Sequence, residues 1–194
     1  MLTRIAYVTN NPYKARESSS ILRELGIEVE VVQVDIPEIQ SDDVVEIAKF
    51  RAREAYRLLK RPVIVEDAGL FIDALNGFPG PYSSYAFKTI GINGILKLMR
   101  GEKRRAATFK SVVVFHDGRR MRAFLGQVRG RISFEPKGSS WGFDPIFEPK
   151  GLKGLTYAQL SPEVKNKVSH RRKALERLAR YLIRRAKHLK REEG

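Results

Sequence analysis

Strand-type and helix-type patterns of apolar residues alternate through the first third of this sequence. In order, the segments are a strand-like run over residues 2–8, a helical pattern over 12–25, alternation over 27–34, a helical pattern over 44–59 and a short buried strand over 62–66. The first helix opens on Pro12, and Gly26 stands just beyond its end. Such alternation predicts parallel strands joined by helices.

The second half of the sequence has a different pattern. Residues 108–116 and 121–129 flank the turn Asp117-Gly118, which predicts a long β-hairpin. Residues 92–99 predict a helix, and a helical segment begins at 161–163 and continues to the C-terminus. Crossed-over and adjacent strands together predict an α/β fold with a mixed sheet flanked by helices. The 194 residues suit one domain, 1–194, ending in a basic helix over about 169–191.

The composition excludes several classes of protein and of functional site. The chain has no cysteine and only three scattered histidines, so disulfides, thiolate zinc sites and cysteine nucleophiles are excluded. Any metal is expected to be bound by oxygen atoms. No apolar run reaches the ~20 residues that a membrane span needs, and the N-terminus lacks a secretion signal. We therefore expect a cytoplasmic protein without a membrane partner.

The net charge of +15 is concentrated near the end of the chain. From Lys165 to Gly194 there are 12 lysines and arginines against 3 glutamates, a net +9. A solvated helix face and nucleic-acid binding both explain such a run. The sequence favours the solvated face, because no aromatic residues are interleaved and no known nucleic-acid motif appears.

Residues 9–14, TNNPYK, end a predicted strand and open a helix. Free N–H groups at a helix start suit a phosphate, and Thr9, Asn11 and Lys14 add hydrogen-bonding groups and a cation. The alternative is that Asn11 only caps the helix before Pro12. A P-loop is excluded because its glycine and lysine pattern occurs nowhere.

Two adjacent carboxylates, Glu66 and Asp67, follow the predicted strand that ends in VIV. Glu38 supplies a possible third carboxylate. Magnesium prefers one or two carboxylates together with phosphate oxygens, so these acids suit a metal beside a phosphate site. The alternative is an exposed strand end.

Two later segments combine aromatic or basic residues with turn signals. Residues 140–147, SWGFDPIF, hold the only tryptophan and Asp144, a combination that can hold a planar base but is also common in cores. Residues 165–175 place Ser169, His170 and Arg171 at a helix start, where they could read a base or bind phosphate. A capped helix with a basic face is the alternative.

The ordered set T-x-N-x-x-K, VEDAGL, GFPGPYS, SWGFDPIF and K-x-x-x-SHRRKAL, between Ile5 and Leu175, resembles the inosine triphosphate pyrophosphatase family. The resemblance implies hydrolysis of ITP, dITP and XTP, non-standard purine nucleotides, to the monophosphate and pyrophosphate. It also implies Mg2+, with Mn2+ as a possible substitute, a homodimer, and an elongated mixed sheet with a cleft between two lobes.

The resemblance assigns roles residue by residue. The triphosphate ligands correspond to Thr9, Asn11 and Lys14, helped by Lys49, and the metal ligands to Glu38 and Asp67. The base pocket corresponds to Trp141, Phe143 and Asp144. The segment that closes over the base and the phosphates corresponds to Lys165, Ser169, His170 and Arg171. Asp67 is also expected to orient or deprotonate the attacking water, and Lys14 to assist catalysis.

Two positions depart from the pattern of the family. Ala68 stands where many relatives have a hydroxyl, and Lys88 falls only near a lysine that some relatives place in the cleft. The alternatives to the family are a Maf-type pyrophosphatase acting on modified pyrimidines and a nucleic-acid-binding protein without enzymatic activity. The first leaves SHRRKAL unexplained.

Overall fold

The computed structural model describes residues 5–192, and side chains as far as residue 188. Its elements in chain order are β1 (Ile5–Val8), α1 (Pro12–Glu24), β2 (Val29–Val32), α2 (Val44–Leu59), β3 (Val63–Ile72), α3 (Ser83–Thr89), α4 (Gly91–Leu98), β4 (Ala106–His116), β5 (Met121–Ile132), β6 (Phe147–Pro149), α5 (Pro162–Val168) and α6 (His170–Glu192). Short 3-10 turns cover Asp73–Leu75, Gly80–Tyr82, Asp144–Ile146 and Tyr157–Gln159.

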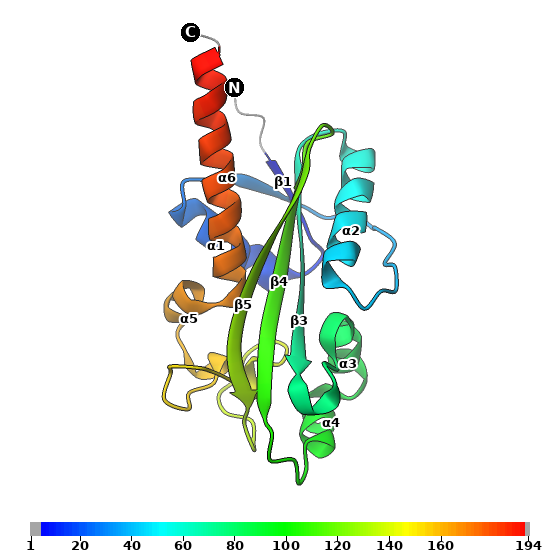
Figure 1. The fold of residues 1–194 in the computed structure, drawn as a ribbon, viewed down its shortest axis with the longest axis vertical. Helices are drawn as coiled ribbons and strands as arrows, with labels where there is room; N and C mark the ends of the chain where they lie inside the picture. The colour runs from blue at the N-terminus through cyan, green and yellow to red at the C-terminus, as the bar shows by residue number, and fades with distance from the viewer. Residues whose placement is uncertain (1–4, 193–194) are drawn as a thin grey trace.

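The strands form one mixed sheet in the order β2-β1-β3-β4-β5-β6. Strand β1 pairs in parallel with β2 and β3, whereas β3, β4, β5 and β6 pair antiparallel in succession. The long strands β3, β4 and β5 run along the elongated molecule (Figure 1). The mixed sheet flanked by helices is therefore confirmed.

Helices cover both faces of the upper sheet. Val63 and Val65 of β3 pack under α2, while Ile64 between them packs in the cluster that contains Leu22 of α1 and Leu175 of α6. A strand buried on both faces reads as a continuous apolar run, which explains the sequence VIV. No helix in the described range is long and apolar enough to cross a membrane.

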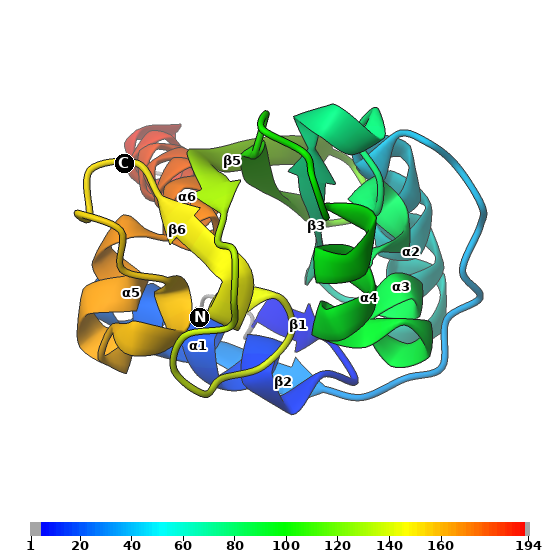
Figure 2. The ribbon, with the colours of Figure 1, turned by 90° about the horizontal axis from the view of Figure 1, so that it is seen from below.

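A third apolar cluster fills the lower part of the molecule. It joins the lower ends of β3, β4 and β5 to α4 and to the segment around Phe143 and Phe147. Seen from below, α3 and α4 lie at one side and β6 with α5 at the other (Figure 2). A Cβ at Gly69 would lie 2.2 Å from the carbonyl oxygen of Gly80, so only glycine lets the GFPGP loop pack against β3.

Several expected boundaries were wrong. Strand β3 does not stop at the carboxylates but continues to Ile72, because β4 pairs with it along this whole length. Strand β6 and helix α3 were missed, and Ser169, with extended backbone, interrupts the C-terminal helical segment. Residues 2–4 of the first expected strand lie outside the described residues.

Candidate functional site

A cleft of about 960 Å³ collects polar and aromatic side chains from separate parts of the chain. Its walls come from the loop between β1 and α1, the segment after β2, helix α2 and strand β3. Helix α3, the turn before Asp144, helix α5 and the start of α6 complete them. The predicted site residues on these walls are Thr9, Asn11, Lys14, Glu38, Asp67, Trp141, Phe143, Asp144, Lys165, His170 and Arg171. Five motifs distant in sequence therefore share one cavity.

Two predicted site residues do not line this cleft. Lys49 is exposed on α2, and the cation that α2 directs into the cleft is Arg51. Ser169 is fully buried, and its hydroxyl accepts a hydrogen bond from the backbone N–H of Arg172. Ser169 thus caps α6.

The TNNPYK loop is closed by its own side chains. The side-chain oxygen of Asn11 accepts hydrogen bonds from the backbone N–H groups of Tyr13 and Lys14, and the hydroxyl oxygen of Thr9 accepts from that of Asn11. The backbone N–H groups of Asn11, Tyr13 and Lys14 are therefore already bonded and not free for phosphate, contrary to our expectation. The hydroxyl proton of Thr9 and the side-chain NH2 group of Asn11 take no part in these bonds. The ammonium of Lys14 lies 3.3 Å from the carbonyl oxygen of Glu66, beside Asp67.

Asp67 lies inside β3 but just beyond the end of the parallel pairing with β1, which stops at Val65. Its carboxylate is 3.2 Å from the guanidinium of Arg51, and both side chains are 18% exposed. Glu38 is exposed and also lines the cleft. No group of three acidic, histidine or cysteine side chains converges among the described residues. Two carboxylates on one cleft fit a divalent ion that takes its other ligands from substrate and water.

Glu66 lies at the centre of a buried polar cluster. Its carboxylate accepts hydrogen bonds from the hydroxyls of Tyr7 and Ser111, each at 2.9 Å, and from Nε of Arg171 at 2.8 Å. Burial alone would raise the pKa of Glu66, but the positive charges of Arg171 and Lys14 outweigh it and hold this pKa well below its usual range. Glu66 is therefore ionised and structural.

Arg171 is held from two sides. Besides Glu66, its Nη1 donates to the carboxylate of Glu17 at 2.6 Å. Burial would lower the pKa of Arg171, but Glu17 and Glu66 raise it, so the guanidinium stays charged. Its Nη2 has no hydrogen-bond partner within the described part of the chain, and Arg171 lines the cleft. The Nη2 group of this firmly held guanidinium is therefore available to donate to a ligand.

Glu17 also connects this cluster to the turn that contains Asp144. Lys165 lies 3.4 Å from Glu17 and 2.6 Å from Asp144. Burial raises the pKa of Asp144, and the charge of Lys165 opposes this only in part. Asp144, at 4% exposure, thus forms an ion pair with Lys165, and both residues line the cleft.

Aromatic rings line the cleft beside this turn. The rings of Tyr13 and Trp141 stack with centroids 5.6 Å apart at 17°. Phe87 contacts Trp141 and packs edge-on against Phe143, which is almost completely buried. Phe143 therefore supports the wall, while Tyr13 and Trp141 offer partly exposed rings.

Three buried polar atoms of this region have no partner among the described residues: Nδ1 of His170, Oε1 of Glu17 and Nε of Arg51. The imidazole of His170 stacks on Phe109 at 4.6 Å. Burial and the neighbouring Arg171 lower the pKa of His170 well below its usual value, so the ring is neutral. Buried polar atoms are normally paired, so such a group beside a cleft indicates a bound ligand or water.

Sequence reasoning missed Arg51, Glu17 and Tyr13. Glu17 stands one turn after Lys14 on α1 and Tyr13 lies within TNNPYK, so helical spacing could have suggested both. Only the tertiary contact with Asp67 reveals Arg51. Lys88, left open by its spacing, lines the cleft.

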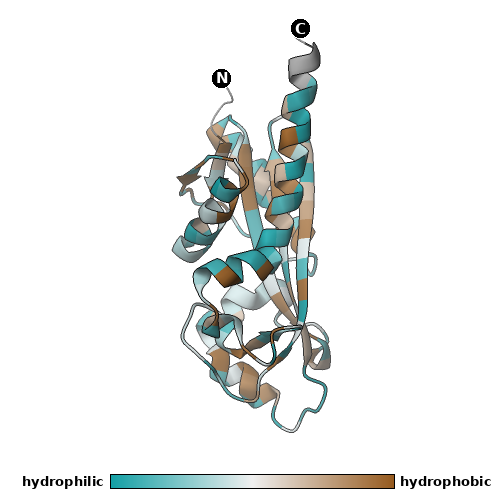
Figure 3. Ribbon diagram, turned by 90° about the vertical axis from the view of Figure 1, so that its left-hand side faces the viewer, coloured by the Kyte–Doolittle hydropathy of each residue, from teal (hydrophilic) through white to brown (hydrophobic). Residues whose placement is uncertain are grey.

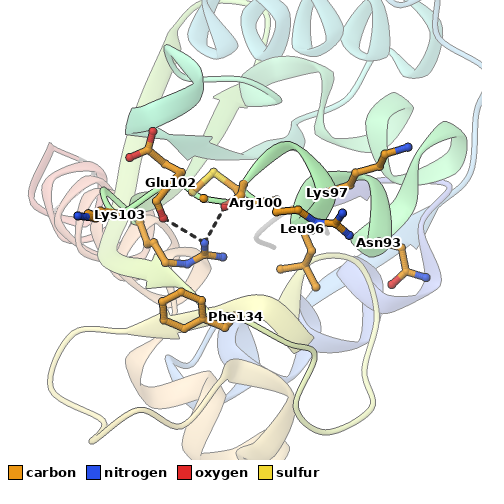
Figure 4. A pocket seen from close by; sticks show the side chains of 10 residues that line it. Asn93, Leu96, Lys97, Arg100, Glu102, Lys103 and Phe134 are labelled. Atoms are coloured by element: carbon orange, nitrogen blue, oxygen red, sulfur yellow. Dashed lines mark hydrogen bonds between the residues drawn. The ribbon is translucent and has the colours of Figure 1, made fainter.

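A second pocket, of about 630 Å³, lies at the end of α4 and contains no predicted site residue. Phe134 and Leu96 lie at this pocket (Figure 4). Arg105 is the buried cation there, and it donates to the carbonyl oxygens of Met99, Ile132 and Ser133. Phe134 covers its guanidinium at 4.4 Å. Arg105 therefore ties the loop before β4 to the end of β5.

Known proteins resemble this chain over nearly its whole length. A protein of Methanopyrus kandleri named dITP/XTP pyrophosphatase is 53% identical over 92% of this chain and 95% of its own, and one of the same name from Thermococcus kodakarensis is 47% identical over 92% and 97%. The structure of the Staphylococcus aureus Ham1 protein matches with a TM-score of 0.80 at 31% identity, covering 93% of this chain and 98% of that one. The Ham1 family matches residues 5–181, and the chain belongs to this family.

Proposed function

We propose that this protein is a nucleoside triphosphate pyrophosphohydrolase that converts dITP, XTP and ITP to the monophosphate and pyrophosphate. The observation that carries the proposal is the convergence of five sequence motifs on one cleft, in a chain 53% identical to a dITP/XTP pyrophosphatase. Such an enzyme removes non-standard purines from the nucleotide pool.

The triphosphate binds at the end of the cleft formed by the TNNPYK loop and β3. Lys14 is the principal cation there, and the hydroxyl proton of Thr9 and the side-chain Nδ2 of Asn11 add hydrogen bonds. Arg51 and Lys88 extend the positive wall. Glu38 and Asp67 would hold a divalent ion, for which we propose Mg2+, and this ion would neutralise phosphate charge.

Asp67 positions the attacking water and accepts its proton. The nearby cations neutralise the phosphates, so the reaction chiefly needs a positioned nucleophile. Lys14 holds the outer phosphates, so pyrophosphate leaves as one unit. In the free protein the guanidinium of Arg51 lies 3.2 Å from the carboxylate of Asp67.

The base lies against Trp141 and Tyr13, with Arg171 at its edge. The free Nη2 of Arg171 is a donor and matches the 6-keto oxygen of hypoxanthine or xanthine. The 6-amino group of adenine is itself a donor, so neither group would be satisfied. Leaving both unpaired costs about 1–3 kcal/mol each, which predicts discrimination against ATP of at least ~100-fold.

The decisive experiment measures kcat/KM for pyrophosphate release from XTP, dITP, ITP, GTP, ATP and dTTP with Mg2+. We expect XTP, dITP and ITP to exceed ATP and dTTP by at least ~100-fold. A preference for dTTP would favour a pyrimidine-specific Maf-type enzyme. Orthophosphate as the first product would refute cleavage between the α and β phosphates.

The assembly and location follow from the same proposal. We propose a homodimer, measured by light scattering after size-exclusion chromatography, and a cytoplasmic location, where nucleoside triphosphates are used. We also propose that residues 1–194 act as one domain with two lobes, because β3, β4 and β5 run through both. A monomer at micromolar concentration would contradict the first of these.

A further inference from the structure

Helix α6 carries a continuous line of cations on its outer side. Lys173, Arg177, Arg180, Arg184 and Lys187 are all exposed and follow one another at steps of four, three, four and three residues. These steps place them on one narrow face of a helix with 3.6 residues per turn. We call these five residues the α6 stripe. It is about 21 Å long at ~1.5 Å per residue.

The α6 stripe lies on the solvent-exposed side of α6. The opposite face of α6 is buried against the sheet through Ala174, Leu175 and Leu178. Helix α6 runs along β5 and continues upward beside the top of the sheet (Figure 1), and hydrophilic residues predominate along it (Figure 3). The stripe is therefore accessible along its whole length.

None of the five stripe residues forms an ion pair within the described part of the chain. Lys173 and Arg177 donate to backbone carbonyl oxygens of β5, which leaves their charge uncompensated. The described acidic residue of α6, Glu176, is paired with Arg172 at 2.8 Å. Like charges three and four residues apart on a helix repel one another, so the stripe costs stability in the free protein.

The proposed catalytic function does not use the α6 stripe. None of its residues lines the cleft described above. Arg184 and Lys187 also lie beyond residue 181, where the match to the family ends. The stripe therefore extends past the residues that match the family.

The turn between β4 and β5 extends the positive surface. Arg185, on the flank of α6, forms an ion pair with Asp117 of this turn. That contact brings the exposed Arg119 and Arg120 beside the upper part of the helix. The positively charged surface formed by the α6 stripe therefore becomes wider at its upper end.

We propose that the α6 stripe binds the phosphodiester backbone of nucleic acid. A row of evenly spaced cations over about 21 Å spans roughly six phosphates of one strand. The stripe is a line of cations without an aromatic side chain to stack on a base, so we expect it to contact phosphates, which carry no sequence information. A membrane surface fits less well, because Ile183 is the one large exposed apolar side chain on the described part of α6. The sequence alone favoured a solvated face, because no aromatic residues are interleaved and no known nucleic-acid motif appears.

The test uses fluorescence anisotropy of a labelled mixed-sequence DNA duplex of about 30 base pairs, and of an RNA duplex of the same length, between about 50 and 200 mM salt. The wild type should bind both, with a slope of log K against log salt of about −4 to −5 for five phosphate contacts. In the triple variant Arg180→Gln, Arg184→Gln, Lys187→Gln this slope should fall in magnitude by about 2 to 3 and binding should weaken at least ~10-fold.

A second triple variant serves as a matched control. Arg100→Gln, Lys103→Gln, Arg104→Gln removes the same charge from exposed positions near the end of α4. It should keep the wild-type slope, and both variants should keep wild-type kcat/KM on XTP. Equal loss of binding in the two variants would show that net charge alone is responsible, and would overturn the proposal. Binding to vesicles of anionic lipid without binding to either duplex would also overturn it, in favour of a membrane.

Discussion

At the scale of single residues, adjacent carboxylates in β3 have opposite environments. The side chain of Glu66 is completely buried and bonded to Arg171, whereas that of Asp67 faces the cleft and is 18% exposed. Alternation along a strand produces this division, because neighbouring side chains point to opposite faces. One carboxylate therefore holds the architecture, and its neighbour is available for chemistry.

Asp67→Asn should lower kcat by about a hundredfold or more while leaving the thermal unfolding temperature close to that of the wild type. The change removes the charge that orients the water and would hold the metal. Steady-state kinetics at saturating Mg2+ measure it. Asp73→Asn is the matched control, because Asp73 lies just beyond β3 and pairs with the exposed Arg129. Near-normal turnover of the Asp67 variant would remove Asp67 from catalysis.

Glu66→Gln should reduce the free energy of unfolding by about 3–5 kcal/mol, because it leaves the buried guanidinium of Arg171 without its full counter-charge. The same change should narrow the ratio of kcat/KM for ITP over ATP, since Arg171 loses one of its two anchors. Chemical denaturation and kinetics measure the two effects.

The matched control for Glu66→Gln is Glu176→Gln, which breaks the partly exposed pair with Arg172 on the same helix. It should change stability by less than about 1 kcal/mol and leave the substrate ratio unchanged. If the Glu66 variant lost stability but kept the wild-type ratio of kcat/KM for ITP over ATP, the proposed reading of the base by Arg171 would be contradicted.

At the scale of elements, the packing of α6 on β5 depends on a single glycine. A Cβ at Gly126 would lie 2.0 Å from the carbonyl oxygen of His170 and 2.4 Å from the backbone nitrogen of Ala174. Real Cβ atoms do not approach backbone so closely, so the start of α6 can lie here only because position 126 has no side chain. That start carries His170 and Arg171 into the cleft.

Gly126→Ala should therefore displace α6, reduce stability by about 1–3 kcal/mol and lower kcat/KM at least ~10-fold. Gly101→Ala provides the comparison: Gly101 has φ of +77° but nothing within 4 Å of a Cβ. It should cost about 1 kcal/mol through backbone strain alone and leave kinetics unchanged. Equal kinetic losses in both variants would argue against the steric explanation.

At the scale of the whole molecule, buried ionisable groups make stability depend on pH. Burial lowers the pKa of His170 well below that of the unfolded chain, about 6.5. Between these two values the unfolded state binds a proton that the native state does not, so stability falls as the pH falls below about 6.5. Glu66, whose pKa is also lowered, adds a further loss only below about 4.3, its unfolded value.

His170→Gln should flatten the dependence of unfolding free energy on pH between about 6.5 and 5, by up to about 1.4 kcal/mol per pH unit. Denaturant titrations at several pH values measure it. A wild-type slope in the His170 variant would show that folding does not lower the pKa of this histidine.

The sequence by itself determined the features that depend on local patterns. Helix α2 over Val44–Leu59 and the hairpin of β4 and β5 were predicted because periodicity and turn signals act over a few residues. The resemblance to the inosine triphosphate pyrophosphatase family was also recognisable, because the motifs are short and ordered, and the match to the Ham1 family confirms it. The mixed sheet followed from the order of these patterns.

Only the tertiary structure decided how far β3 extends and what its two carboxylates do. Pairing with β4 carries β3 past Asp67, and the partner that buries the charge of Glu66 is Arg171, 105 residues later. Only the tertiary structure likewise showed that Arg51 contacts Asp67 and that Lys49 does not line the cleft. The physical reason is that burial and charge pairing depend on which side chains the fold brings within a few ångströms, and no local pattern encodes that distance.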